Sequence, residues 1–257
     1  MINAKDSKNT FYILDKKTDV PIVFIHGVGL NHKIWEPQIN VFENTFLAYD
    51  ILGHGKTPLD KENLSFDDFS NQLINLIDEL NIRRIHLVGF SIGSLIARNF
   101  ASKYSDRLES LILLCSIFRR TEKQQQIVKD RFELAKKSKS LSKQALKRWF
   151  TDEYLEKNPN TYKKISSILE QNSMENFLKI YELFVNHKDD EQFEKIKTKT
   201  LIMTGEGDIG STPEMSINLS KVINNSNVKI ISKGKHLCSI ECADDVNMAI
   251  KKHIQND

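Results

Sequence analysis

The chain has 257 residues, of which 40% are hydrophobic and 28% charged, with only ten glycines and five prolines. This length and composition suit one large globular domain, or a core with a small insertion, and argue against disordered and fibrous classes. The net charge of +3, with no basic stretch interleaved with aromatic residues, argues against nucleic acid as a partner.

The N-terminus and the cysteines indicate where the protein works. The first ten residues are polar and lack the apolar centre of a signal peptide, and the apolar runs are far shorter than the roughly 20 residues of a membrane span. Cys115, Cys238 and Cys242 make an odd number of cysteines, which favours free thiols in a reducing compartment. The spacing of His236, Cys238 and Cys242 fits no zinc pattern. We therefore expect a cytoplasmic protein with no bound metal and no membrane contact.

Short apolar runs alternate with amphipathic segments through the first 116 residues. The runs are β-branched and end in glycine or turn residues, which is typical of buried strands. Alternation of strands and helices predicts a mostly parallel sheet that is covered by helices on both faces. Strands are predicted within residues 9–15, 20–27, 45–55, 83–90 and 108–116, and helices from Ser65 or Asp67 through about Leu80 and over residues 92–104.

The alternation stops at about residue 117 and resumes at about residue 188. Strands are then predicted at 199–208 and 227–234, with helices over about 213–223 and from about Asp244. The simplest organisation is one α/β domain, made of residues 1–116 and 188–257, interrupted by a helical insertion of residues 117–187. Within the insertion, helices are predicted at 122–137, 142–150, 161–171 and 173–184.

The insertion is locally basic. Between Arg119 and Arg148 there are 11 Lys or Arg residues and 3 Asp or Glu residues, a local excess of eight positive charges. One interpretation is that these are solvated helix faces, as most charge runs are. The other is a positive rim that steers anionic substrates toward a site below it.

The stretch Gly89-Phe90-Ser91-Ile92-Gly93 matches the pattern G-x-S-x-G, between a predicted strand and a predicted helix. A nucleophile on such a tight turn has a strained backbone, and side chains larger than glycine would collide with the neighbouring strand and helix. The Ser91 hydroxyl is expected to project into the open, above the positive end of the following helix. The alternative is an ordinary loop serine.

A nucleophilic serine needs a base, and the base needs an acid that orients it. His236 and Asp208 each follow a predicted strand in the second half of the core, and the carboxyl ends of parallel strands meet at one edge of a sheet. Asp208 is preferred over Glu206 as the acid because it lies deeper in its loop, although an Asp beside glycine is also a common turn residue or helix cap.

With these residues in place, the chain resembles the α/β-hydrolase superfamily, in which the order along the chain is Ser, acid, His. The resemblance implies an eight-stranded, mostly parallel sheet with a helical lid and extends over essentially the whole chain. It is carried by the stretches FIHGVG (24–29), YDILGHGKT (49–57), GEGDIGSTPEM (205–215) and GKHLCSIE (234–241).

The resemblance also implies roles for individual residues. Ser91 would be the nucleophile, Asp208 the acid and His236 the base, and the backbone amides of Val28 and Ile92 would form the oxyanion hole. His26 and His54 would then shape loops, and Trp35 would lie near the entrance of the active site.

The insertion resembles the lid of 3-oxoadipate enol-lactonases, through ALKRWFTDEYLEKNP (145–159) and MENFLKIYELF (174–184), and GSTPEM (210–215) also occurs in that branch. Trp149 is either a wall of the substrate pocket or part of the lid core. Ser94 departs from the family, which often has Gly or Ala there, and we expect its hydroxyl to bond to a carbonyl one turn earlier.

These observations predict a cytoplasmic serine hydrolase, a monomer or homodimer, that acts on a small ester or lactone, with a carboxylate-bearing substrate as one version. No cofactor is expected, because no G-x-G-x-x-G stretch has the required strand and helix context. Serine in place of aspartate at position 91 argues against haloalkane dehalogenases and many epoxide hydrolases. The alternatives are a carbon–carbon bond hydrolase or a thioesterase with the same triad, or a weakly catalytic receptor or regulatory protein on this fold.

Overall fold

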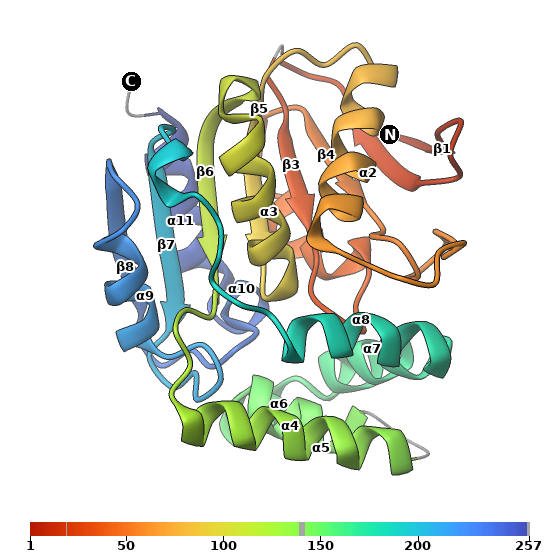
Figure 1. Cartoon of the computed structure of the whole chain (residues 1–257), viewed down its shortest axis with the longest axis vertical. Coiled ribbons are helices and arrows are strands. Elements are labelled where there is room, and N and C mark those ends of the chain that lie inside the picture. The colour runs from red at the N-terminus through yellow and green to blue at the C-terminus, as the bar shows by residue number, and fades with distance from the viewer. Residues whose placement is uncertain (19, 139–141, 256–257) are drawn as a thin grey trace.

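An eight-stranded sheet forms the centre of the molecule (Figure 1). The structure is a computed structural model and describes residues 1–18, 20–138 and 142–255. The strand order is β1-β2-β4-β3-β5-β6-β7-β8; β2 is antiparallel to both β1 and β4, and all other neighbours are parallel. The strands are β1 (Ile2–Lys5), β2 (Phe11–Asp15), β3 (Ile22–Ile25), β4 (Phe46–Tyr49), β5 (Ile85–Phe90), β6 (Leu108–Leu114), β7 (Thr200–Gly205) and β8 (Ser226–Ile231).

Helices cover both faces of the sheet, as the alternation predicts. In Figure 1, α2, α3 and α9 lie in front of the sheet and α11 lies behind it. The short helices α1 and α10 pack against each other on the α11 side. The core helices are α1 (Glu36–Ile39), α2 (Phe66–Glu79), α3 (Ile92–Lys103), α9 (Pro213–Ser220), α10 (Cys238–Glu241) and α11 (Ala243–Gln255), with 3-10 turns η1 (His32–Trp35), η2 (Ser105–Arg107) and η3 (Phe193–Lys195).

Strand β3 illustrates how the sheet separates two hydrophobic cores. Successive side chains of a strand point to opposite faces. Val23 and Ile25 therefore belong to the core under α2 and α3, whereas Phe24 lies between them in the core on the α11 side. All three are fully buried, and each such side chain contributes roughly 1.5–3 kcal/mol by leaving water.

Helix α2 begins where the sequence indicates. Of the two predicted caps, Ser65 is the N-cap, and its backbone amide donates to the carboxylate of Asp68 at 2.9 Å in a capping box. Phe69 and Leu73 lie on the inner face of the helix and are fully buried.

The helical insertion lies across the carboxyl ends of the parallel strands, at the bottom of Figure 1. We call this insertion, which contains the helices α4–α8, the lid. Helix α4 packs against α8, and α5 against α7. The lid helices are α4 (Glu122–Lys137), α5 (Ser142–Trp149), α6 (Asp152–Lys157), α7 (Pro159–Glu170) and α8 (Met174–Val185).

The structure also contains elements that were not predicted, among them the short helices α1 and α10, strand β1 and helix α6. Strand β1 (Ile2–Lys5) is an edge strand that pairs only with β2, and its residues are largely exposed, so it has no apolar pattern to reveal it. Helix α6 has six residues and none of them is buried, so its sequence shows no helical period.

One buried arginine joins the lid to the core. Arg98, on α3, is fully buried and donates to the carbonyl of Ile117 at 2.8 Å, where the chain leaves the core. Its guanidinium also donates to Asp189 and Glu191, each at 2.7 Å, where the chain returns. Both ends of the lid are therefore held by a side chain from the helix that follows Ser91.

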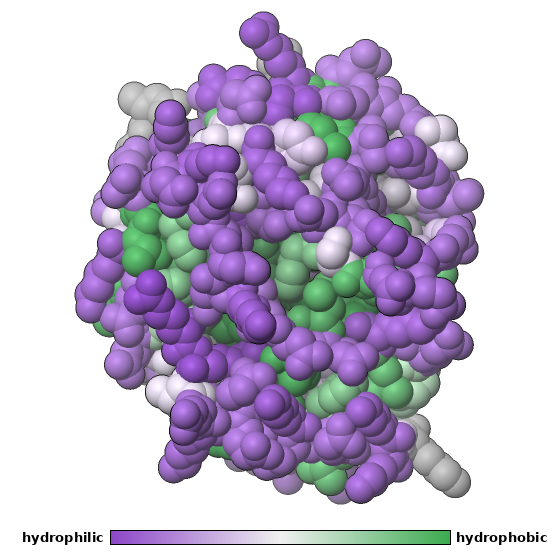
Figure 2. All heavy atoms as spheres, in the orientation of Figure 1, coloured by the Kyte–Doolittle hydropathy of each residue, from purple (hydrophilic) through white to green (hydrophobic). Residues whose placement is uncertain are grey.

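The surface is mainly hydrophilic, with smaller areas of apolar side chains between charged ones on the face that Figure 2 shows. Within the described residues, no helix combines the length and apolar character required to cross a membrane.

Candidate active site

Ser91 lies at the junction between β5 and α3, in a backbone conformation with φ 55° and ψ −120°. A positive φ is strained for a residue with a side chain, and such strain persists only where the surroundings hold it. Here the Ser91 amide donates to the carbonyl of Leu114 on β6 at 2.9 Å. The hydroxyl of Ser94 donates to the Ser91 carbonyl at 2.6 Å, the contact expected from the sequence.

The two glycines of the motif leave room for this turn. A Cβ atom on Gly89 would lie 2.2 Å from the carbonyl oxygen of Gly93, and one on Gly93 would lie 2.5 Å from the carbonyl oxygen of Ile25 on β3. Both contacts are with backbone atoms, which cannot move aside. Any larger residue at either position would displace the helix from the strands and move Ser91.

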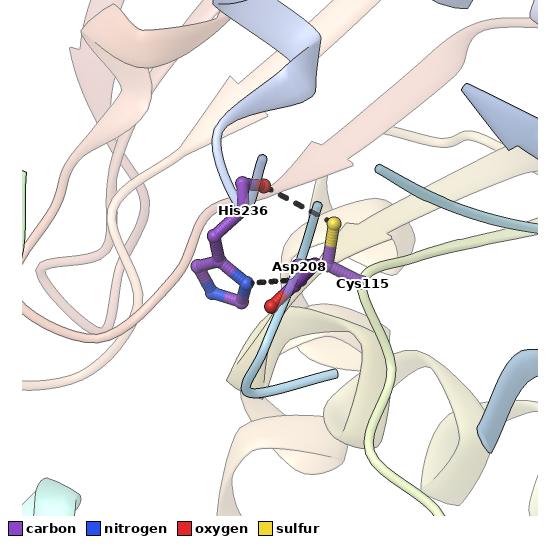
Figure 3. A group of neighbouring side chains, drawn as sticks. All are labelled: Cys115, Asp208 and His236. Atoms are coloured by element: carbon purple, nitrogen blue, oxygen red, sulfur yellow. Dashed lines mark hydrogen bonds and ion pairs between the residues drawn. The ribbon is translucent and has the colours of Figure 1, made fainter. Parts of the chain in front are cut away.

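His236 and Asp208 lie beside Ser91, although 145 and 117 residues separate them from it in the chain. The Nδ1 atom of His236 donates to Asp208 Oδ2 at 2.6 Å, and its Nε2 atom lies 3.2 Å from Ser91 Oγ. Figure 3 shows the His236 ring turned toward the Asp208 carboxylate. With the proton on Nδ1, Nε2 accepts from the serine hydroxyl, which is the arrangement that nucleophilic catalysis requires.

The loop after β7 fixes the Asp208 carboxylate. Its Oδ1 atom accepts from the amides of Gly210 at 2.8 Å and Ser211 at 3.0 Å, so Oδ2 is left to face the histidine. The rival acid, Glu206, accepts instead from the Lys233 amide and the Ser232 hydroxyl on the exposed side of the same loop.

Electrostatics couples the two titratable groups. Burial alone lowers the pKa of His236, but the negative charge of Asp208 and its hydrogen bond outweigh burial and raise the pKa above the usual range. Burial raises the pKa of Asp208, yet the His236 charge and the loop amides bring it below its usual value. Asp208 is therefore ionised, and it favours a positive charge on the His236 ring.

Cys115 supports the histidine from behind. Its Sγ atom lies 3.1 Å from the backbone carbonyl of His236, and Figure 3 shows the thiol facing that carbonyl. Burial raises the pKa of Cys115 well above its usual value, so the thiol keeps its proton and donates a hydrogen bond to that carbonyl. Cys115, Asp208 and His236 place potential ligand atoms within 4.8 Å of one another. A protonated thiol, and a carboxylate that is hydrogen-bonded to the His236 ring, are poor metal ligands.

A second convergent group, His187, Asp189 and Glu191, lies where the lid returns to the core. The Arg98 guanidinium already pairs with both of its carboxylates. Within the described part of the chain, the trio His236, Cys238 and Cys242 is not among the groups that converge in this way.

The two residues with the predicted oxyanion amides flank Ser91. Ile92 is the first residue of α3, so its amide has no carbonyl partner within the helix. Val28 follows β3 and lines the same cavity as Ser91. The next residue, Gly29, has φ 75°, and its amide donates to His54 Nε2 at 2.7 Å, which fixes this loop.

His26 and His54 hold loops, as the resemblance implies. His26 Nε2 accepts from the Ile51 amide at 3.1 Å, and its Nδ1 lies 2.8 Å from the Gly27 carbonyl. Burial lowers the pKa of His26 to about 4 and that of His54 to about 3, so both rings are neutral at physiological pH. Each ring accepts a backbone N–H through Nε2.

A cavity of about 490 Å³ opens above Ser91, between the core and the lid. Trp149 lines it, with its ring centroid 6.2 Å from that of His236. Trp35 does not line it: the side chain is fully buried and packs on Phe24, with a centroid distance of 4.9 Å, on the α11 side of the sheet.

The cavity also contains residues that sequence reasoning did not single out. Arg120, Arg131 and Arg148 line it from the lid, together with Tyr181. The only sequence signal was the basic excess of the insertion, which does not tell which of its residues turn inward.

Comparison with known proteins agrees with this architecture. The family model of the alpha/beta hydrolase fold matches residues 20–242, so the chain belongs to the alpha/beta hydrolase fold family. Among curated proteins, the chain is 26% identical over 255 residues to (E)-2-((N-methylformamido)methylene)succinate hydrolase of Acinetobacter baylyi, covering 97% of this chain and 95% of that protein. It is 23% identical to 3-oxoadipate enol-lactonase 2 of the same organism, covering 97% and 94%.

Among solved structures, an enol-lactonase from Burkholderia xenovorans superimposes with a TM-score of 0.91 and 22% identity, covering 99% of this chain and 100% of that one. At this identity the likeness establishes the shared fold. It confirms the predicted eight-stranded, mostly parallel sheet with a helical lid.

Proposed function

We propose that the protein is a serine hydrolase that cleaves a small carboxylic ester or lactone through Ser91, His236 and Asp208. The observation that carries the proposal is the continuous hydrogen-bonded line from Asp208 through His236 to the strained Ser91, at the floor of the cavity. The names of the two Acinetobacter baylyi relatives support a hydrolase, and the name of the enol-lactonase supports cleavage of a lactone.

In the proposed mechanism, His236 Nε2 takes the hydroxyl proton of Ser91 as Oγ attacks the substrate carbonyl. The oxyanion accepts from the Val28 and Ile92 amides. His236 then gives its proton to the departing alcohol or enol oxygen, which leaves an acyl-enzyme on Ser91. Water, activated by the neutral His236, attacks the acyl carbon and releases the acid. Each step uses groups that lie at the cavity floor, and no metal or cofactor takes part.

We further propose that residues 117–187 act as a lid that selects the substrate, and that Trp149 contributes a wall of the pocket. Trp149 lines the cavity with its ring centroid 6.2 Å from that of His236, which supports this role. Trp35 is left out of the proposal because its side chain is fully buried and does not line the cavity. A cytoplasmic location belongs to the same proposal and is supported by the three cysteines, all of which are free.

The test is a substrate panel of short esters, enol-lactones and thioesters, with a carbon–carbon cleavage substrate of the aromatic meta-cleavage type. Each compound is assayed with the wild type and with Ser91→Ala. We expect ester or lactone turnover that Ser91→Ala abolishes. A Ser94→Ala variant is the matched control, because it removes a neighbouring hydroxyl that points to a backbone carbonyl.

Three other outcomes would contradict the proposal. Preferred turnover of the thioester, or of the carbon–carbon substrate, would reassign the reaction while keeping the triad. Turnover that survives Ser91→Ala would remove Ser91 from the mechanism. Absence of turnover over the whole panel would favour a binding or regulatory protein on this fold.

A further inference from the structure

Three arginines converge on the cavity from different parts of the lid. Arg120 precedes α4, Arg131 lies within α4, and Arg148 lies near the end of α5. All three line the cavity that also contains Ser91 and are partly buried there. Tyr181, on α8, lines the cavity with them. Four positions on separate segments thus face one space.

Little negative charge compensates these guanidinium groups, since Asp189 acts on Arg120 only from beyond ion-pair distance. Among the residues that the structure describes, none of the three forms an ion pair with a carboxylate. Arg120 donates to the carbonyls of Phe184 at 3.1 Å and Val185 at 3.3 Å, and to the side-chain amide oxygen of Gln125. Arg148 donates to the Gln144 carbonyl at 2.9 Å. Neutral oxygens satisfy some N–H groups of these side chains, and no carboxylate of the described residues is in direct contact with them.

The arginines also repel one another. Burial lowers the pKa of Arg120 to about 10. Tyr181 and Asp189 act in the opposite direction, and the positive charge of Arg131 acts in the same direction as burial. Burial and Arg131 likewise lower the pKa of Arg148. Partly buried like charges without a counter-charge are costly, and an anion placed among them would remove that cost. A guanidinium group keeps its proton in proteins, so the three groups are charged and available to an anion.

We propose that Arg120, Arg131 and Arg148, with the Tyr181 hydroxyl, form an anion-binding subsite in the lid that holds a carboxylate of the substrate while the scissile carbonyl lies on Ser91. This inference rests on the proposed function and names its substrate class: small esters or lactones that carry a carboxylate on the acyl part. A planar guanidinium binds a carboxylate through two parallel hydrogen bonds, which fixes orientation as well as charge.

Tyr181 fits the role of a neutral donor. Burial raises its pKa, while the three arginines act in the opposite direction without overcoming burial, so the hydroxyl keeps its proton at neutral pH. A hydroxyl can donate to a carboxylate beside the guanidinium groups. Because Arg131 is on α4, Arg148 on α5 and Tyr181 on α8, a bound carboxylate would connect three lid helices.

Binding is tested first, without chemistry, on wild-type protein by thermal unfolding with glutarate as the probe and neutral glutaramide as its control. We expect glutarate, and not glutaramide, to raise Tm, and Arg131→Gln and Arg148→Gln to reduce that rise. Lys129→Gln is the matched control, because it removes one exposed charge from α4 outside the cavity lining. Equal Tm shifts in all four proteins, or an equal shift with glutaramide, would overturn the subsite.

Specificity is tested with the para-nitrophenyl monoester of glutaric acid and its neutral methyl-capped analogue. At low salt, Arg131→Gln and Arg148→Gln should each lower kcat/KM for the carboxylate ester by about 10- to 100-fold, the range of one charge-assisted hydrogen bond. The neutral analogue should be unaffected. In wild type, salt should weaken the preference for the carboxylate ester, since a Debye length of about 10 Å at 0.1 M screens half-buried charges in part.

The two proposals fail in different ways. If wild type hydrolyses the two esters with equal kcat/KM at low salt, the subsite is wrong and the Ser91 hydrolase remains. If glutarate binds through Arg131 and Arg148 but no ester, lactone or thioester is turned over, the subsite remains and the hydrolase is wrong.

Discussion

Arg98 and Arg131 carry the same side chain in opposite electrostatic settings. Arg98 is fully buried in the core and pairs with Asp189 and Glu191, while two aromatic rings, those of Phe118 and Phe193, lie within 5.9 Å and 5.0 Å of its guanidinium. Arg131 lines a cavity beside two other arginines. In the part of the chain that the structure describes, it has no carboxylate partner. Charge that folding has already compensated holds the structure together, whereas uncompensated charge in a cavity is available to a ligand.

The same contrast separates the core from the lid as a whole. In the core, the Asp208 carboxylate accepts hydrogen bonds from two loop amides and from the His236 ring. Its orientation is therefore fixed before substrate arrives. Such preorganisation is what transition-state stabilisation requires. By the proposal above, the lid arginines gain a carboxylate partner only when an anion binds. We therefore expect core substitutions to change catalysis or stability strongly, and lid substitutions to change substrate choice with little effect on folding.

The largest effect is expected for Asp208→Asn, which keeps the size of the side chain and removes its charge. We predict a fall in kcat of about 10³- to 10⁴-fold, because the amide no longer stabilises the correct tautomer and the charged ring. Only neutral His236 acts as the base. Since Asp208 raises the pKa of His236, wild-type activity is lost as pH falls through that raised pKa. The acid limb of the variant should shift to lower pH.

The measurement for Asp208→Asn is kcat/KM against pH with a chromogenic ester. Glu206→Gln is the control, since that carboxylate faces the exposed side of the same loop. An unchanged acid limb in Asp208→Asn would mean that Asp208 does not control the histidine.

Next in size is the effect of Arg98→Met on stability. Removing the guanidinium leaves Asp189 and Glu191 as partly buried, uncompensated charges, and breaking such a group typically costs about 3–5 kcal/mol in the free energy of unfolding. Chemical denaturation measures it. Lys103 lies on the same helix as Arg98 and forms an exposed ion pair with Asp67 of α2. Lys103→Met should therefore cost less than about 1 kcal/mol. Equal losses in the two variants would show that the Arg98 network adds nothing to stability.

The smallest stability effect is expected for Arg131→Gln. Because Arg131 repels the neighbouring arginines and, among the described residues, has no carboxylate partner to lose, the free energy of unfolding should stay within about 0.5 kcal/mol of wild type or rise slightly. The same denaturation experiment, without added anions, measures it beside Lys129→Gln. A loss as large as that of Arg98→Met would place Arg131 in the folded framework and break the contrast between the two regions.

Most of the core could be predicted from the sequence because its signals are local. Short apolar runs in the sequence predict the buried strands. Gly89 and Gly93 indicate a turn in which a larger side chain would collide with backbone atoms. The chain order of Ser91, Asp208 and His236, with the topology of parallel strands, was enough to expect them at one edge of the sheet.

The remaining features depend on tertiary packing. Trp35 was expected at the entrance, but its side chain packs on Phe24 and is not among the residues that line the cavity. Arg120, Arg131 and Arg148 are three of 11 basic residues in a short segment, and only the packing of α4 against α8 and α5 against α7 determines which of them turn inward. Cys115 had no local signal at all.

The most direct test of the account is covalent labelling of wild type and Ser91→Ala with a fluorophosphonate, followed by intact and peptide mass spectrometry. Ser91, activated by a His236 ring that Asp208 orients, attacks the phosphorus and displaces fluoride. The account predicts one adduct per chain, located at Ser91, in the wild type and none in Ser91→Ala. An adduct at another residue, or no adduct on a protein that cleaves esters, would contradict it.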